Sequence, residues 1–196
     1  MAELRIGCLV MAAGSGSRFG RNKLEAVVDG KSLLRRSLEA VPAEEFAQVT
    51  VVTQYDAAAA LAEEFGFTVV RNDRPEDGLS RTVRLGTEAM AGCGAILYQV
   101  ADQPLLEQET VRRELEYFRT HPDHIVGLAH NGVRGNPCIF PRKFFPELMA
   151  LEGDVGGSAV IKVHPDTLLL YETSAAELRD VDTVEALAAV QEDRQI

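Results

Sequence analysis

The chain has 196 residues, with 20 Lys and Arg against 30 Asp and Glu, so its formal charge is -10. This acidity argues against sequence-independent binding to nucleic acid or to an anionic membrane, because both need a basic surface on the protein. The length is most economically a single domain over residues 1–196, large enough for a substantial core.

The three cysteines indicate neither a disulfide framework nor a zinc site. Cys8, Cys93 and Cys138 are scattered and form no C-x-x-C pair. The first residues lack the basic-then-apolar order of a signal peptide, and no apolar run approaches the ~20 residues that a membrane helix needs. We therefore expect a soluble, cytoplasmic protein with Cys8 and Cys138 in its core.

The first predicted element is a buried strand over residues 5–11, and a glycine-rich loop follows it over residues 12–24. Glycines let the backbone approach a ligand closely, and successive N–H groups in such a loop can form an anion-binding nest. Arg18 adds a planar fork of donors and Lys23 a compact charge, both suited to phosphate oxygens. The loop therefore predicts a binding site for a nucleoside triphosphate.

Three other interpretations of this loop are open. A dinucleotide fingerprint needs G-x-G-x-x-G and an acid about 20 residues later, but the glycines here are spaced one residue too far and no acid follows at that distance. A P-loop needs G-x-x-x-x-G-K-[ST], but Glu25 stands in place of the first glycine, and Ser32 fits better as the N-cap of a helix over residues 33–40. A plain strand-to-helix turn leaves the two cations unexplained.

Strands alternate with helices along the rest of the chain, which is typical of an α/β domain with a largely parallel sheet. The pattern predicts strands at 48–53, 67–70, 95–100 and 167–171, short strands at 125–128 and 138–140 around a loop at 132–137, and helices at 56–65, 79–91, 108–119 and 184–190. Ligands of such sheets bind outside the carboxyl ends of the strands. The polar loops that follow the strands are therefore candidates for the site.

For several residues in these loops, the sequence is consistent with either a structural or a functional role. Asp102 follows the strand at 95–100 and is well placed to hold Mg²⁺, which takes one or two protein carboxylates plus substrate phosphates and water, but it could instead be a turn-forming aspartate. Ser80 lies where the free N–H groups of a helix start could contact a nucleotide, but it could be an ordinary N-cap. Asp182 has the spacing of a capping box with Glu185.

The motifs of these loops, taken together, resemble those of the MobA-like nucleotidyltransferases, a family that includes the enzymes attaching CMP or GMP to molybdopterin. The matched segments, in order along most of the chain, are Ala12-Ala13-Gly14-Ser15-Gly16-Ser17-Arg18-Phe19-Gly20, Asn22-Lys23-Leu24, Asn72 with Gly78-Leu79-Ser80, Ala101-Asp102-Gln103-Pro104, Gly135-Asn136-Pro137, Gly153-Asp154 and Asp180-Val181-Asp182-Thr183. The resemblance implies a Rossmann-like three-layer α/β/α fold with a mostly parallel mixed sheet, of the nucleotide-diphospho-sugar transferase type.

The resemblance also implies a role for each matched residue. Two cations would be catalytic, namely Arg18 and Lys23. Nucleotide contacts would come from Ala12, Ala13, Gly14, Ser15, Gly16, Asn72, Gly78 and Ser80. Mg²⁺ would be held by Asp102 and Asp182, with Asp180 as the substitute for Asp182. The acceptor would be contacted by Asn136 and Asp154.

The reaction implied is transfer of a nucleotide from a nucleoside triphosphate to a phosphate acceptor, molybdopterin first, with release of pyrophosphate. A phosphate nucleophile is already anionic, so positioning and charge neutralisation would supply catalysis without a general base. Relatives that open with Ala-Ala-Gly tend to use CTP and those with Ala-Gly-Gly use GTP, so Ala13 predicts CTP. GTP, a sugar- or polyol-phosphate acceptor, and a non-catalytic accessory protein that hands the cofactor to a molybdoenzyme remain as alternatives.

The loop over residues 153–158 departs from the family pattern. Relatives commonly follow Gly-Asp-x-Gly with alanine and a basic residue, whereas this chain has Gly157 and Ser158, and Lys162 is the nearest cation. The family's grip on the acceptor phosphate is therefore either missing here or supplied by another residue.

Overall fold

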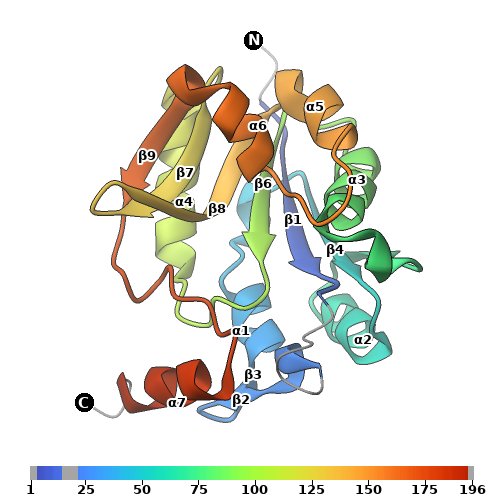
Figure 1. The fold of residues 1–196 in the computed structure, drawn as a ribbon, viewed down its shortest axis with the longest axis vertical. Helices are drawn as coiled ribbons and strands as arrows, with labels where there is room; N and C mark the ends of the chain where they lie inside the picture. The colour runs from blue at the N-terminus through green and yellow to red at the C-terminus, as the bar shows by residue number, and fades with distance from the viewer. Residues whose placement is uncertain (1–3, 15–21, 194–196) are drawn as a thin grey trace.

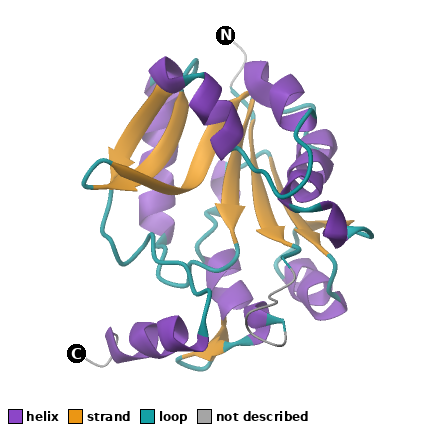
Figure 2. Cartoon of the chain, in the orientation of Figure 1, coloured by secondary structure: helices purple, strands orange, loops and turns teal. Residues whose placement is uncertain are grey.

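A computed structural model describes residues 4–14 and 22–193, and Figures 1 and 2 draw the fold. Ser15, Gly16 and Arg18, which the sequence assigns to the nucleotide site, lie outside the described residues. No helix in the described part of the chain is long and apolar enough to cross a membrane.

Seven strands form one mixed sheet in the order β5-β4-β1-β6-β8-β7-β9. Their bounds are β1 (Ile6–Ala12), β4 (Gln48–Thr53), β5 (Thr68–Arg71), β6 (Ala95–Val100), β7 (Ile125–His130), β8 (Val133–Pro141) and β9 (Leu168–Glu172). Every pairing is parallel except those of β8, which runs antiparallel to β6 and β7. The predicted mostly parallel mixed sheet is confirmed.

Helices cover both faces of this sheet, as Figure 2 shows. One face carries α1 (Leu33–Glu39), α2 (Asp56–Glu64) and α4 (Gln108–Thr120), and the other carries α3 (Leu79–Ala89), α5 (Phe145–Met149) and α6 (Ser158–Val163). Successive strand residues point to opposite faces, so Cys8 and Val10 of β1 pack in the first layer's core and Leu9 in the second's. This is the expected three-layer α/β/α arrangement, and Cys8, Cys93 and Cys138 are buried free thiols within it.

A third, smaller cluster lies at the end of the sheet where the parallel strands β1 and β6 finish (Figure 1). It joins the hairpin of β2 (Val27–Val28) and β3 (Lys31–Ser32) to the last helix, α7 (Val184–Asp193). Ser32 Oγ accepts a hydrogen bond from the Arg35 N–H at 3.2 Å, so the predicted N-cap of α1 is confirmed. The remaining helical segments are short 3₁₀ turns, namely η2 (Lys23–Glu25), η3 (Ala43–Glu45), η4 (Pro75–Asp77), η5 (Arg142–Phe144) and η6 (Pro165–Thr167).

The prediction of a loop over residues 132–137 is wrong. β7 and β8 form a hairpin whose turn has positive φ at Asn131 (51°) and Gly132 (76°), and β8 begins immediately after it. Residues 135–137 of β8 stand opposite Leu128 alone, in a wide irregularity of the β7–β8 ladder. Pro137 is tolerated there because a residue inside a bulge need not donate a ladder hydrogen bond.

Candidate active site

Three charged side chains from distant parts of the sequence meet beyond the carboxyl ends of β1 and β6. The ammonium of Lys23 lies 2.5 Å from Oδ2 of Asp102 and 2.8 Å from Oδ1 of Asp182. The side chains of Lys23 and Asp102 are 15% and 18% exposed, whereas that of Asp182 is 53% exposed, so solvent screens the second ion pair more. The structure thus brings the predicted catalytic lysine together with both predicted metal ligands.

The local chain conformation explains how these residues meet. Lys23 begins η2, where the Asn22 side chain caps the turn by accepting from the Leu24 N–H at 3.1 Å. The N–H of Val181 donates to the carbonyl of Asp102 at 2.9 Å. Val181 is fully buried in the cluster with α7 and the β2–β3 hairpin, so it anchors Asp182 beside Asp102.

The helix cap next to Asp182 differs from the prediction. The hydroxyl of Thr183 accepts from the Ala186 N–H at 3.1 Å, so Thr183 caps α7 and the capping role predicted for Asp182 is wrong. The carboxylate of Asp182 instead contacts Lys23. A threonine and an aspartate side by side are both good caps, so the sequence alone does not distinguish them.

The carboxylates determine the charge state of the cluster. Loss of hydration lowers the pKa of the Lys23 ammonium, but the carboxylates of Asp102 and Asp182 outweigh it and raise that pKa, so Lys23 stays protonated. At Asp180, loss of hydration and then repulsion from Asp102 and Asp182 raise the pKa to about 6. Such a shift is expected where several carboxyl groups gather.

The carboxylates suit a hard divalent cation that is completed by substrate. Oδ1 of Asp102 is buried and has no hydrogen-bond partner in the described part of the chain, whereas Oδ2 accepts from Lys23. Carboxylate oxygens are the ligands that Mg²⁺ prefers, usually one or two of them with waters and substrate phosphates. Within residues 4–14 and 22–193, no group of three or more His, Cys, Asp or Glu side chains could hold a metal by itself. The residues therefore fit a Mg²⁺ ion shared with a bound phosphate.

A cavity of about 150 Å³ lies beside this cluster. Its wall includes Lys23, Asp102, Ala13 and Gly14, together with apolar side chains from β1, β6 and the start of α3. Ala13 is 5% exposed and Ala12 is 1% exposed, so both residues are buried at this end of β1. The cavity lies where ligands bind in open α/β sheets.

Three side chains that sequence analysis missed hold the backbone after β1. The Thr53 hydroxyl donates to the Ala12 carbonyl at 2.9 Å, and the Gln54 amide donates to the Ala13 carbonyl at 2.7 Å. The Tyr55 hydroxyl donates to the Gly14 carbonyl at 2.9 Å. Their only sequence signal is a polar run at the end of β4, the parallel neighbour of β1. By fixing these carbonyls they hold in place the start of the predicted nucleotide loop.

Asn72 and Gly78, in the second predicted nucleotide segment, contact other residues of the protein. Asn72 is 2% exposed, and its amide donates to the Thr82 hydroxyl at 3.2 Å while its oxygen accepts from the Arg74 N–H at 3.1 Å. Gly78 has φ of 86° and packs so tightly that a Cβ there would lie 2.5 Å from the carbonyl of Gly153. Asn72 and Gly78 thus shape the segment, and their contact with a nucleotide stays a prediction.

The start of α3 is capped from another loop. Oδ1 of Asp154 accepts from the Leu79 N–H at 3.3 Å, so the alternative that Ser80 caps this helix is wrong. Ser80 is fully buried, and its hydroxyl has no hydrogen-bond partner among the described residues. Asp154 therefore ties the predicted acceptor loop to the predicted nucleotide segment. Asn136, in the bulge of β8, lines a cavity together with Leu79 of that segment and Ser158 of that loop.

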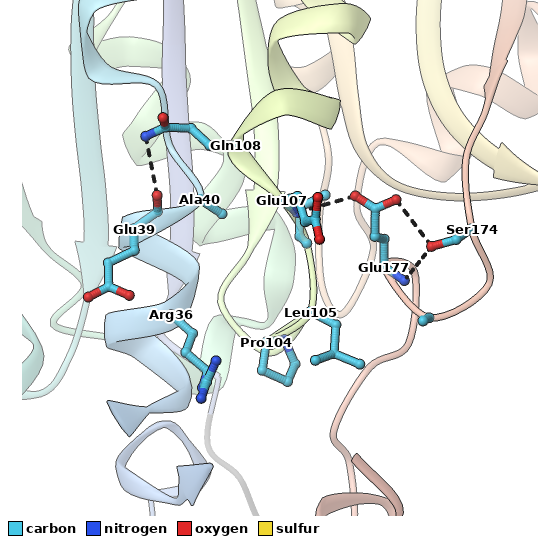
Figure 3. A pocket seen from close by; sticks show the side chains of 11 residues that line it. Arg36, Glu39, Ala40, Pro104, Leu105, Glu107, Gln108, Ser174 and Glu177 are labelled. Carbon is cyan, nitrogen blue, oxygen red and sulfur yellow. Dashed lines mark hydrogen bonds between the residues drawn. The ribbon is translucent and has the colours of Figure 1, made fainter. Parts of the chain in front are cut away.

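A larger cavity, about 520 Å³, lies elsewhere, between the end of α1, the start of α4 and the loop before α7 (Figure 3). Glu39, Glu107 and Glu177 line it, and the Arg36 guanidinium there donates to the carbonyl of Val28 at 2.6 Å. Three carboxyl groups repel a triphosphate. This cavity is therefore a poor candidate for the nucleotide.

Comparison with known proteins identifies the family of this chain. A family model described as the MobA-like NTP transferase domain matches residues 8–168. The chain is 30% identical over 130 residues to the bifunctional protein GlmU of Bifidobacterium animalis subsp. lactis (strain AD011), covering 62% of this chain and 28% of that protein. It is also 30% identical over 118 residues to the 2-C-methyl-D-erythritol 4-phosphate cytidylyltransferase of Dehalococcoides mccartyi (strain CBDB1), covering 57% of this chain and 52% of that protein.

The matched segment spans about half the length, or less, of these two curated relatives. A solved structure, a nucleotidyl transferase from Methanothermobacter thermautotroptrophicus, has the same fold, with a TM-score of 0.78 and 23% identity over 98% of this chain and 99% of that one. The family model extends over most of the sequence, from β1 to the start of β9. The chain therefore belongs to the MobA-like NTP transferase domain family.

Proposed function

We propose that this protein is a nucleotidyltransferase that moves CMP from CTP to the phosphate of molybdopterin. An oxygen of the acceptor phosphate forms a bond to the α-phosphorus, the bond from that phosphorus to the bridging oxygen breaks, and pyrophosphate leaves with the electron pair. The observation that carries the proposal is the cluster of Lys23, Asp102 and Asp182 beside the cavity formed by Ala13 and Gly14.

Each group of the cluster has a separate task. Lys23 balances the charge that develops at the α-phosphate, and its ion pairs keep it protonated and fixed next to the cavity. Asp102, through the unpartnered Oδ1, and Asp182 would hold Mg²⁺. When bound, Mg²⁺ supplies neutralisation of phosphate charge and a common anchor for both substrates. Arg18 holds the β- and γ-phosphates in this proposal, on the sequence pattern alone.

Two observations support CTP as the donor. The methyl group of Ala13 lines the cavity and narrows the space beside the nucleotide relative to glycine, which excludes a purine more readily than a pyrimidine. The Dehalococcoides mccartyi relative is a cytidylyltransferase. That relative also favours a second candidate function, transfer of CMP to a polyol phosphate, on the same site.

The experiment is a product assay with Mg²⁺, CTP or GTP, and either molybdopterin or 2-C-methyl-D-erythritol 4-phosphate as acceptor. We expect pyrophosphate release with CTP and molybdopterin, and a CMP-containing dinucleotide as product. Turnover of the polyol phosphate alone would favour the second candidate, and a preference for GTP would favour guanylyl transfer. Binding of molybdopterin without pyrophosphate release from any pair would indicate an accessory protein and refute the proposal.

A further inference from the structure

Arg134 of β8 has no acidic partner in the described part of the structure. Eight others form ion pairs with Asp or Glu side chains, namely Arg35, Arg36, Arg71, Arg74, Arg81, Arg112, Arg113 and Arg119. The guanidinium of Arg134 instead donates to neutral acceptors. In a chain with a formal charge of -10, an uncompensated cation of this kind attracts an anion.

The neutral contacts hold the guanidinium in one orientation. It donates to the Ser158 hydroxyl at 2.7 Å, to the Gly135 carbonyl at 3.2 Å and to the Cys138 sulfur at 3.3 Å. Gly157 brings Ser158 close to the sheet, because a Cβ at Gly157 would lie only 2.7 Å from the ring of Phe140. The loop over residues 153–158 lacks the basic residue of the family pattern, and Arg134 of β8 thus places a cation beside it.

Arg134 also stands at the wall between two cavities. The first, about 120 Å³, contains Arg134, Asn136 and Ser158 and shares Met11, Leu79 and Val100 with the cavity of Lys23 and Asp102. The second, about 490 Å³, contains the same Arg134 and Asn136 and extends to Gln103 and Asp180. Arg134 and Asn136 therefore lie on the wall that the larger cavity shares with the smaller one, which in turn adjoins the cavity of Lys23 and Asp102.

We propose that Arg134, oriented by Ser158, binds the phosphate group of the acceptor. This proposal rests on the nucleotidyl transfer proposed above and names the residue that holds the nucleophile for it. A guanidinium can give a phosphate two parallel hydrogen bonds and stays charged at every working pH, so it positions the attacking oxygen without taking a proton. The amide of Asn136, presented by the bulge of β8, lies on the same wall and can add a donor.

The test measures binding of inorganic phosphate by isothermal titration calorimetry, with the nucleotide site saturated by α,β-methylene CTP, which cannot release pyrophosphate. We expect Arg134→Gln to weaken phosphate binding by about tenfold to a hundredfold, the usual effect of losing hydrogen bonds to a charged group. Ser158→Ala should weaken it less, by about threefold, because it loosens the orientation and keeps the charge. Lys162→Gln, which removes an exposed cation from the same helix as Ser158, is the matched control and should change nothing.

A rescue variant separates a lost binding group from a damaged fold. Ser158 lies within hydrogen-bond distance of Arg134, so Arg134→Gln combined with Ser158→Arg should recover most of the phosphate affinity, while every variant binds α,β-methylene CTP as the wild type does. Phosphate binding that survives Arg134→Gln, or a wild type that binds no phosphate, would overturn the inference. A wild type that binds phosphate but neither binds the CTP analogue nor releases pyrophosphate would instead refute the proposed function.

Discussion

Glu114 on α4 offers a quantitative test of how the core is built. Its side chain is fully buried, and neither carboxyl oxygen has a hydrogen-bond partner among the described residues. Burial raises the pKa of Glu114 well above its usual range, which favours the protonated carboxyl group in the folded protein. Glu114→Met keeps a similar volume and removes both unsatisfied oxygens.

The magnitude follows from these two oxygens. A buried polar group without a partner costs about 1–3 kcal/mol, so Glu114→Met should raise the free energy of unfolding by about that amount at low pH and by more at pH 7. The gain depends on pH. At a pH below the ordinary pKa of a glutamate, the carboxyl group is neutral in both states and the difference is smallest. As the pH rises, only the unfolded chain releases its proton, so the wild type loses stability until the pH passes the raised pKa of the folded state.

The assay is urea-induced unfolding of the wild type and Glu114→Met between pH 5 and pH 8. We expect the free-energy difference between the two proteins to grow with pH. Glu116→Met, an exposed glutamate on the same helix, is the control and should show neither the gain nor the pH dependence. A Glu114→Met variant that is less stable than the wild type at pH 8, or a difference that is the same at every pH, would refute this reasoning.

Three predictions concern the active site. Arg18→Ala should lower turnover by roughly a hundredfold, as the loss of one preorganised donor does, with an unchanged circular dichroism spectrum; an unchanged rate of pyrophosphate release would remove Arg18 from the site. Asp102→Asn should lower Mg²⁺-dependent pyrophosphate release far more than Asp182→Asn. The reason is that Asp102 is mostly buried, whereas Asp182 is half exposed and does not cap α7. Full activity of both variants at limiting Mg²⁺ would contradict the metal site. The wild type should prefer CTP over GTP by about 10–200-fold, the range that shape alone provides, and Ala13→Gly should reduce this preference. Calorimetric titrations with CTP, GTP, UTP and ATP measure it. A wild type that prefers GTP would contradict the role of Ala13.

The centre of the fold could be predicted from sequence because buried parallel strands are continuous apolar runs. β4 and β6 have the bounds that their apolar runs predict. The sequence failed at β8, because its Gly and Pro residues are typical of turns and only the pairing with β7 places them inside a bulge. The five-residue α5 and six-residue α6 are too short to show a helical period.

The active-site residues could be identified individually, but their contacts could not. Lys23 meets Asp102 across 79 residues of sequence and Asp182 across 159. Asp182 is anchored there by Val181, a buried valine with no distinguishing local signal. Arg134 was missed for a similar reason. Its partner Ser158 comes from a helix 24 residues further along the chain, so nothing in the local sequence marks the pair.

The most direct test of the central claim is a crystal structure of the protein with α,β-methylene CTP and Mg²⁺. We expect the triphosphate in the cavity of Ala13 and Gly14, the ammonium of Lys23 against the α-phosphate, and the metal ion bound to Oδ1 of Asp102. A nucleotide bound in the larger cavity of Glu107 and Glu177, or a metal ion bound away from Asp102, would contradict the account.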